Sequence, residues 1–404
     1  MATEPFALQR PQAARSLVSA YYMILFSTGL LVALGMAMVV SSHTVDALAV
    51  GESPWAKARE QGIFIAIGIV GGFALSRVPI PAWEKWWAWV AFGGTLAFQI
   101  LVPFIGSSYG GNTNWLMIGD HSVQPAEFLK YGLAVWLGSV LAAKARLLGD
   151  WFHLAVPALV GVAMAGGVVV LGHDAGTAFV IGVMAVGTLV VAGVPWRRIG
   201  VVVAGLGLAA AVEVLTDSER RTRLEVLFDP SVCDRSAECW QVNQAGYALA
   251  EGGWFGQGLG ASRVKWEWLS QADSDFIFAV IGAELGLVGC IVVLLLFAVL
   301  AVGLFQVVRL HPNRFAQITV GAIGCWLLGQ AVINIGMVIR LLPVIGVPLP
   351  FVSSGGSALI AGLAAIGTVI GLMRGDPDIG PLLRARRGIV ATAFGVFAPR
   401  RVRT

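Results

Sequence analysis

Residues 273–306 read DSDFIFAVIGAELGLVGCIVVLLLFAVLAVGLFQ, in which two aspartates precede a long apolar run. A helix of roughly 20 apolar residues crosses a hydrocarbon core of about 30 Å. The run lacks the apolar–polar alternation of a membrane-spanning strand. The stretch therefore predicts a transmembrane helix with Asp273 and Asp275 at one end and Glu284 inside it.

The rest of the chain has the same apolar character. Of its 404 residues, 57% are hydrophobic and 12% charged, and the mean hydropathy is +0.81. That is more apolar surface than a water-soluble core needs. The pattern predicts an all-α, polytopic membrane protein of about ten transmembrane helices. The predicted spans lie near 19–42, 61–78, 86–106, 125–144, 152–171, 176–194, 198–216, 273–306, 315–341 and 350–375.

The distribution of Lys and Arg predicts the orientation of these spans, because short cytoplasmic loops carry an excess of basic residues. We expect both termini in the cytoplasm. Segment 1–18 would precede a membrane domain over 19–375 with a large extracytoplasmic loop, 217–272, and a basic tail, 376–404. The net charge of +4 then describes a basic inner face and not a nucleic-acid site. The tail either contacts anionic membrane lipid or is a disordered basic segment.

Ionisable residues inside a span are candidates for function, because exposing them to lipid is costly. Glu127 and Lys130 lie three residues apart in one predicted span, a spacing that lets them pair on one helical face. The pair either docks neighbouring helices or lines a polar cavity. Trp115, in the outer segment before this span, is either an aromatic-belt residue or part of a site.

Further candidates lie in the outer segments. Asp174 stands near the start of a span, where a side-chain acceptor can cap the helix. Cys233 and Cys239 face the oxidising side with five residues between them, so a small disulfide is plausible. No CxxC pair or Cys/His set predicts a structural metal site. The basic residues of the 217–272 loop include Arg220, Arg221, Arg223, Arg263 and Lys265.

Residues 340–360, RLLPVIGVPLPFVSSGGSALI, contain three prolines that forbid a continuous helix. Irregular backbone at this depth must be buried in protein or face water. Ser353 and Ser354 precede two glycines that permit close approach to a ligand or a helix. The segment is therefore a candidate part of a site.

In a continuous helix, Asp275 and Glu284 would lie on opposite sides, about 13 Å apart along the axis. They are therefore not a carboxylate pair acting on one bond. Asp273 or Asp275 alone has a simpler interpretation, as a cap of the helix. Glu284 must turn toward the bundle interior, as a polar tether or as part of a cavity.

Five ordered motifs resemble those of the SEDS family of bacterial cell-wall polymerases, the group of FtsW and RodA, over about residues 15–374. The residues of the segments SRVKW and PLPFVSSGGS favour the division branch, FtsW. The motifs are NWLMIGDHSVQPAEFLK, HDAGTA, GGWFGQGLGASRVKW, SDFIFAVIGAELGLVG and LLPVIGVPLPFVSSGGSALI.

The resemblance implies a glycosyltransferase of the cytoplasmic membrane's outer leaflet, which joins the units of lipid II into a lipid-linked glycan strand. Asp275 matches the family's essential aspartate, Trp115 its outer-loop tryptophan, and Glu127 and Lys130 polar residues of its central cavity. The implied partner is a class B penicillin-binding protein, whose helix would pack beside the eighth and ninth spans; other division or elongation proteins would assemble with it. Four positions depart from the family pattern: Asn114, His173, Asp273 and Ala283.

As a mechanism, we hypothesise that Asp275 accepts the proton of an acceptor sugar hydroxyl while a pyrophosphate lipid departs. The loop cations, together with Arg340, would stabilise the pyrophosphate. A divalent ion, Mg²⁺ or Mn²⁺, is an alternative element of the site, and Asp275 would then hold it instead of acting as base. Two other functions stay open: a transporter of lipid II, and a non-catalytic scaffold of the division machinery.

Overall fold

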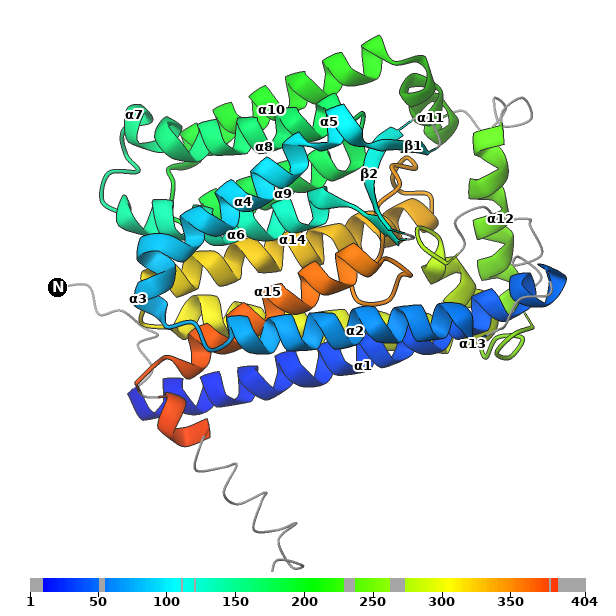
Figure 1. The fold of residues 1–404 in the computed structure, drawn as a ribbon, viewed down its shortest axis with the longest axis horizontal. Helices are drawn as coiled ribbons and strands as arrows, with labels where there is room; N and C mark the ends of the chain where they lie inside the picture. The colour runs from blue at the N-terminus through cyan, green and yellow to red at the C-terminus, as the bar shows by residue number, and fades with distance from the viewer. Residues whose placement is uncertain are drawn as a thin grey trace, which may run out of the picture.

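The computed structural model describes residues 10–50, 55–109, 112–119, 121–228, 237–261, 273–377 and 379–383. Long helices run side by side in one direction, and the shorter connecting elements gather at the two ends of the bundle (Figure 1). In chain order the helices are α1 (Arg10–Val50), α2 (Ala56–Leu75), α3 (Ile80–Ala82), η1 (Trp83–Trp87), α4 (Ala88–Ile100), α5 (Val102–Ile105), α6 (Pro125–Ala143), α7 (Trp151–Leu154), η2 (Ala155–Leu159), α8 (Val160–Leu171), α9 (Ala175–Val191), α10 (Trp196–Thr216), α11 (Ser218–Phe228), α12 (Ala237–Gly252), α13 (Ile277–Leu310), α14 (Arg314–Val338) and α15 (Gly356–Arg374).

Each of the ten predicted spans overlaps a helical stretch of the structure. Among the described residues, nine stretches are long and apolar enough to cross a membrane, and α9 is a shorter apolar helix of 17 residues. Two of the nine, Ile80–Ile105 and Trp151–Leu171, consist of several consecutive helical pieces. The protein is therefore an all-helical, multi-pass membrane protein. Its first helix begins at Arg10, inside segment 1–18.

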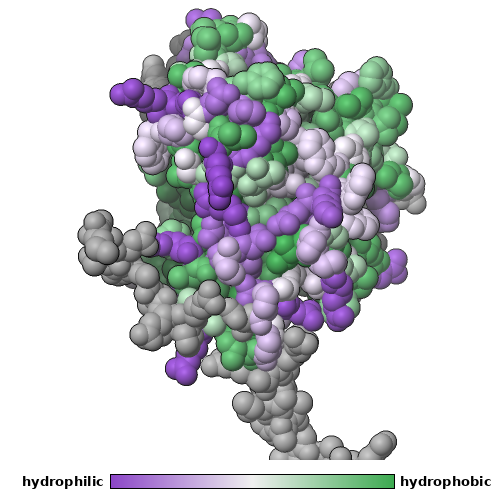
Figure 2. All heavy atoms as spheres, turned by 90° about the vertical axis from the view of Figure 1, so that its left-hand side faces the viewer, coloured by the Kyte–Doolittle hydropathy of each residue, from purple (hydrophilic) through white to green (hydrophobic). Residues whose placement is uncertain are grey.

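Some structure between the spans was not predicted. Three short antiparallel strands form a small sheet between α5 and α6: β1 (Ser107–Tyr109), β2 (Asn112–Ile118) and β3 (His121–Val123). The predicted loop 217–272 contains α11 and α12. These elements lie together with the start of α13 at the right-hand end of the bundle in Figure 1. Figure 2 shows the opposite end, where hydrophilic residues form a band beside hydrophobic ones.

The most polar span lies at the centre of the bundle. α6 is the least apolar of the nine spans, yet 83% of its most apolar stretch is buried in protein, whereas only 6% of the corresponding stretch of the more apolar α10 is buried. This relation is inverted compared with a water-soluble protein, because lipid takes the place of water as the surrounding solvent. Ionisable side chains on α6 are thus shielded from lipid by protein on every side.

α13 is not continuous, because Gly286 has φ 67° and ψ −164° in its interior. The loop after α12 supplies backbone partners at this break: the Gln257 and Gly258 N–H groups donate to the carbonyls of Ala283 and Glu284, at 2.9 and 3.0 Å. In return, the Leu287 N–H donates to the Gly253 carbonyl at 2.9 Å. The break is tolerated because protein satisfies the freed backbone groups. A side chain at Gly286 would also bring Cβ to 2.4 Å from a backbone nitrogen of the loop.

Candidate functional site

Asp275 lies in a turn, residues 273–276, immediately before α13. The residue at the helix cap is Phe276, and no side chain caps the first turn. The interpretation of Asp273 or Asp275 as the cap of this helix is therefore wrong. Both residues lie in the turn before the helix, and the helix begins only after Phe276. For the same reason the helical separation predicted for Asp275 and Glu284 does not apply. Asp275 remains partly accessible at the end of the bundle.

The turn is held by α14 and by the proline-containing segment that follows it. The Asn334 side-chain amide on α14 donates to the Asp275 carbonyl at 2.8 Å and to the Val347 carbonyl at 2.7 Å. The Ser353 hydroxyl donates to the Ser274 carbonyl at 2.5 Å and accepts from the Leu349 N–H at 2.8 Å. The predicted serines thus fix the backbone that carries Asp275.

Segment 340–355 is irregular, as its prolines predict, and it packs against protein. Gly346 has φ 65°, and a side chain at this position would lie 3.5 Å from the Asp275 carboxylate. A glycine is favoured there because of the left-handed conformation. Beside it, the Ser354 N–H donates to the Asp273 carbonyl at 2.9 Å. The segment therefore forms one wall around the two aspartates.

Burial, together with the negative charges of Asp273 and Asp174, raises the pKa of Asp275 to about 7. Burial also acts on Asp273, but the charge and hydrogen bond of Lys57 hold the pKa of Asp273 below its ordinary value. Lys57, on α2, contacts the Asp273 carboxylate directly. The turn thus presents two neighbouring carboxyl groups whose affinities for protons differ, an arrangement typical of acid–base sites.

Asp174 caps α9, as its position predicted. One carboxylate oxygen accepts from the Thr177 N–H at 2.9 Å, and the other accepts from the Gln124 side-chain amide at 3.1 Å. The Gln124 N–H in turn donates to the Ser357 hydroxyl at 2.9 Å. The start of α6 and the start of α15 are thereby joined beside the carboxylates.

Glu127 and Lys130 form the predicted pair on one face of α6. The Lys130 ammonium donates to Glu127 at 2.8 Å and to the Gln330 side-chain oxygen at 2.7 Å, and Lys130 is fully buried. The Gln330 amide donates to the Pro348 carbonyl at 2.9 Å. Because Gln330 and Asn334 lie one turn apart on α14, the pair is connected through neighbouring residues to the Asp275 turn.

Glu284 is buried in α13 and acts as a tether. Its carboxylate accepts from the Ser41 hydroxyl of α1 at 2.7 Å. The Ser41 hydroxyl accepts from the Gly260 N–H at 2.9 Å. The first and eighth spans are thereby connected to the loop that closes the break in α13.

The described cations of the 217–272 loop have partners within the protein. Arg220 pairs with Glu213 and with Asp217, the latter at 3.2 Å, and donates to the His173 carbonyl at 3.1 Å. Arg221 pairs with Glu225 at 3.4 Å, and Arg223 also has a partner. Arg220 and His173 help to line a cavity of about 410 Å³.

The remaining candidates are distributed as follows. Arg340 donates to the Asn243 side chain on α12 at 2.7 Å. Trp115 is half-buried in β2, where it pairs with Ser107 of β1. Arg263, Lys265 and Cys233 lie outside the described residues, as does the Cys239 side chain. The disulfide therefore stays a prediction.

At the four positions that depart from the family motifs, the structure shows distinct environments. Asp273 has the Lys57 partner described above, and His173 has φ 64° at the turn before Asp174. The Asn114 side-chain oxygen is buried without a hydrogen-bond partner. Ala283 is buried beside the break in α13.

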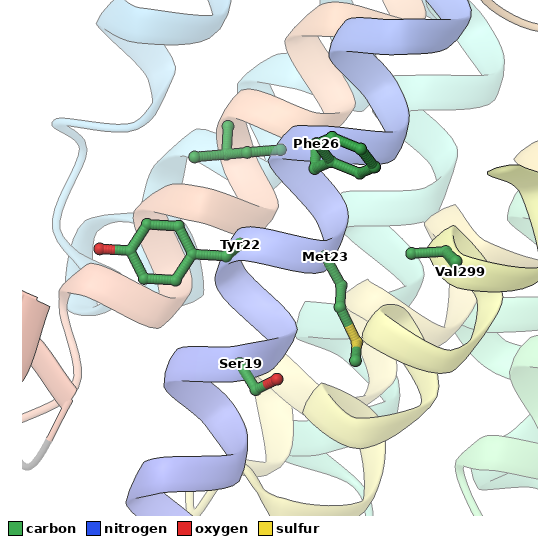
Figure 3. A pocket seen from close by; sticks show the side chains of 6 residues that line it. Ser19, Tyr22, Met23, Phe26 and Val299 are labelled. Carbon is green, nitrogen blue, oxygen red and sulfur yellow. The ribbon is translucent and has the colours of Figure 1, made fainter.

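A second concavity is apolar and remote from Asp275. It measures about 580 Å³ and lies between α1 and α13, with Met23 turned toward Val299 (Figure 3). Val299 is about 30 Å along α13 from its first residue, at a rise of about 1.5 Å per residue. Among the described residues, no group of three or more His, Cys, Asp or Glu side chains is arranged to hold a metal ion. The divalent ion thus stays a prediction.

Sequence reasoning missed Lys57, Ser41, Gln330 and Asn334. Two of them could have been identified from the sequence. Gln330 and Asn334 are amides four residues apart in an apolar span, so they lie on one helical face. The partners of Lys57 and Ser41 lie more than 200 residues away in the chain. Sequence spacing contains no information about those contacts.

The comparisons with known proteins agree with this architecture. A solved structure described as "Structural coordination of polymerization and crosslinking by a peptidoglycan synthase complex" superposes with a TM-score of 0.68 at 25% identity, over 86% of this chain and 95% of that one. The crystal structure of Thermus thermophilus rod shape determining protein RodA gives 0.63 at 24% identity, over 87% and 95%. The latter likeness supports the fold.

Sequence relatives extend the likeness. A probable peptidoglycan glycosyltransferase FtsW from Mycobacterium tuberculosis is 32% identical over 375 residues, which cover 92% of this chain and 71% of the relative. Stage V sporulation protein E from Bacillus subtilis is 32% identical over 357 residues, 87% and 96% of the two chains. The model of the FtsW, RodA and SpoVE family, described as "Cell cycle protein", matches residues 21–376. The chain therefore belongs to the FtsW, RodA and SpoVE family.

Proposed function

We propose that this chain is a peptidoglycan glycosyltransferase that polymerises glycan strands from lipid II during cell division, at the outer leaflet of the bacterial cytoplasmic membrane. Relatives that are 32% and 34% identical are named probable peptidoglycan glycosyltransferase FtsW. The observation that carries the proposal is Asp275, a partly accessible residue at one end of a helical bundle, whose carboxyl group has a pKa raised to about 7.

In the proposed reaction, Asp275 accepts the proton of the acceptor sugar's 4-hydroxyl. The hydroxyl oxygen forms a bond to the anomeric carbon of the growing strand, and the bond from that carbon to the pyrophosphate breaks. The electron pair and the negative charge leave with the lipid pyrophosphate. A base with a pKa near the working pH suits this step, because it is largely free to accept a proton and still holds it well.

The protein's own residues would position this base. Asn334 and Ser353 fix the turn through its carbonyl groups, and the Ser274 side chain hydrogen-bonds the Asp275 carboxylate. Orientation of a reacting group in this way lowers the entropy lost on reaching the transition state. In this proposal Arg220 contributes by attaching the start of α11 to Glu213 of α10, since its own charge is balanced by two carboxylates.

A polymerisation assay tests the proposal. Purified protein in lipid vesicles is given lipid II, and the glycan product is followed by gel electrophoresis. We expect Asp275→Asn to lower the rate at least about 100-fold, the lower end of what a general base contributes. The matched control is Glu60→Gln, an exposed carboxylate on α2 at the same end of the bundle.

Normal polymerisation by Asp275→Asn would overturn the catalytic assignment. Movement of lipid II across the vesicle membrane without polymer growth would instead support a transporter. If cells divide normally with the variant while the protein still recruits its partners, a scaffold is supported. Repeating the assay with a chelator measures any dependence on Mg²⁺ or Mn²⁺.

The proposed setting includes a crosslinking partner, a class B penicillin-binding protein at the division septum. The support is the similarity to a structure whose title describes polymerization and crosslinking by a peptidoglycan synthase complex. The proposed orientation, with both termini in the cytoplasm, places the Asp275 end of the bundle outside. Labelling a cysteine introduced at Ser218 with an impermeant reagent in intact cells tests that orientation.

A further inference from the structure

Lys57 is a cation that the proposed reaction does not yet use. It lies in the first turn of α2 and contacts the carboxylate of Asp273, 216 residues further along the chain. The exposed fractions of the two side chains are 35% and 22%. The pair thus lies at the margin of the protein, close to the turn that carries Asp275.

The Asp273 end of this pair is firmly placed. The Ser354 N–H donates to the Asp273 carbonyl at 2.9 Å, and the Ser354 side chain also hydrogen-bonds the Asp273 carboxylate. One residue on, the Ser274 carbonyl accepts from Ser353. Lys57 therefore attaches α2 to a turn that segment 340–355 and α14 also hold.

The charged groups around Asp275 come from three elements. Asp273 lies in the same turn, Asp174 lies at the start of α9, and Lys57 on α2 acts through Asp273. The α14 side chain at this place is the neutral Asn334, and segment 340–355 presents Gly346. Among the residues that the structure describes, Lys57 is therefore the cation that offsets the negative charge next to Asp275. Removing it alone would leave Asp273 uncompensated two residues from the proposed base.

We propose that Lys57 is a positioning residue for glycan polymerisation that acts through Asp273: by pairing with Asp273 it balances the negative charge beside Asp275. This inference rests on the proposed function.

The test compares four variants in the lipid II assay as a function of pH. With Lys57→Met, we expect the acid limb of the rate profile to move up by about one pH unit, because uncompensated Asp273 disfavours ionised Asp275. That shift lowers the rate at pH 7 about fivefold and leaves the plateau at high pH unchanged. Asp273→Asn should move the limb to lower pH, and the double variant Lys57→Met/Asp273→Asn should return it close to wild type.

Two controls distinguish charge balance from loss of folding. Lys57→Arg keeps the charge and should keep the profile, whereas Arg59→Met removes an exposed cation from the same turn of α2 and should change nothing. If the acid limb of Lys57→Met superimposes on wild type, or only the plateau falls, the proposal is overturned. A purely structural role would lower the rate equally at every pH.

A second measurement does not depend on polymerisation. Carbodiimide modifies protonated carboxyl groups, so the labelling of Asp275 against pH, followed by mass spectrometry, reports its titration directly. We expect the pH midpoints of labelling to follow the same order as the acid limbs. The midpoint should be highest in Lys57→Met and lowest in Asp273→Asn, and the wild type and the double variant should lie between them. If the wild-type protein does not polymerise lipid II but these midpoints shift, the proposed function fails while the charge balance stands. Unshifted midpoints overturn the Lys57 proposal whatever the enzyme does.

Discussion

Two lysine–carboxylate pairs in this protein have the same chemistry and different surroundings. Lys130 and Glu127 lie three residues apart on the central helix α6, with side chains 0% and 2% exposed. Lys57 and Asp273 join distant parts of the chain, with side chains 35% and 22% exposed. Loss of one member of a buried pair leaves a charge that water cannot solvate, whereas in a partly solvated pair water stabilises the remaining charge enough for the protein to stay folded. The first pair is therefore a condition of folding, and the second adjusts the charge beside a reactive group.

The two pairs are nevertheless connected through α14. Gln330 binds Lys130 and the Pro348 carbonyl, and Asn334 binds the Val347 and Asp275 carbonyls. The adjacent carbonyls of Val347 and Pro348 thus connect segment 340–355, through Asn334 and Gln330, to the Asp275 turn and to Lys130. Disturbance of the buried pair should reach the Asp275 turn through this segment.

The largest expected effect follows from breaking the buried Lys130–Glu127 pair. Lys130→Met leaves Glu127 charged and enclosed by protein, which should lower the free energy of unfolding by about 3–5 kcal/mol. The measurement is the thermal midpoint and the yield of monodisperse protein in detergent. The double variant Lys130→Met/Glu127→Gln should recover much of the loss. A single variant as stable as wild type would show that the two pairs do not differ in the way described.

An intermediate effect concerns pH and sharpens the role of the exposed pair. The ionised form of Asp275 is the proposed base, and its pKa is raised to about 7. The polymerisation rate should therefore rise with pH through about 7, and at pH 6 it should be about tenfold below its plateau. The measurement is the initial rate from pH 5.5 to 9. A flat profile between pH 5.5 and 7 would contradict the assignment.

The smallest expected effect concerns an ion pair that is more exposed than either of the two lysine pairs. Arg221 and Glu225 pair on α11 with side chains 64% and 54% exposed. Solvent-exposed pairs of this spacing contribute below about 0.5 kcal/mol, so Arg221→Ala should leave the thermal midpoint nearly unchanged. A large loss of stability would mean that α11 contributes more to the fold than its surface position suggests.

Local features of the chain were predictable from sequence. The ten spans followed from hydropathy, because crossing the membrane imposes the same length and composition on each helix independently of its neighbours. The Glu127–Lys130 pair followed from helical spacing, and the Asp174 cap from its position before α9. The polarity of α6 also indicated its central place, since ionisable residues must avoid lipid.

Other features were missed because each depends on residues far apart in the chain. The break at Gly286 requires the loop after α12 as a backbone partner. The sheet over residues 107–123 consists of strands of three to seven residues, too short for a reliable pattern. The motif around Asp275 read as the start of a helix, but contacts from α14 and segment 340–355 hold it as a turn.

The amino-acid sequence by itself determined that this protein crosses the membrane many times, which helices do so, and that one of them carries an ion pair. Those properties depend on each residue's cost of transfer into lipid and on helical periodicity, which act over a few turns. Only the tertiary structure decided that Lys57 meets Asp273, that Arg220 is balanced by acids, and that Asp275 lies in a turn among carboxylates. Charge interactions depend on distance in space, and the packing of the bundle sets that distance.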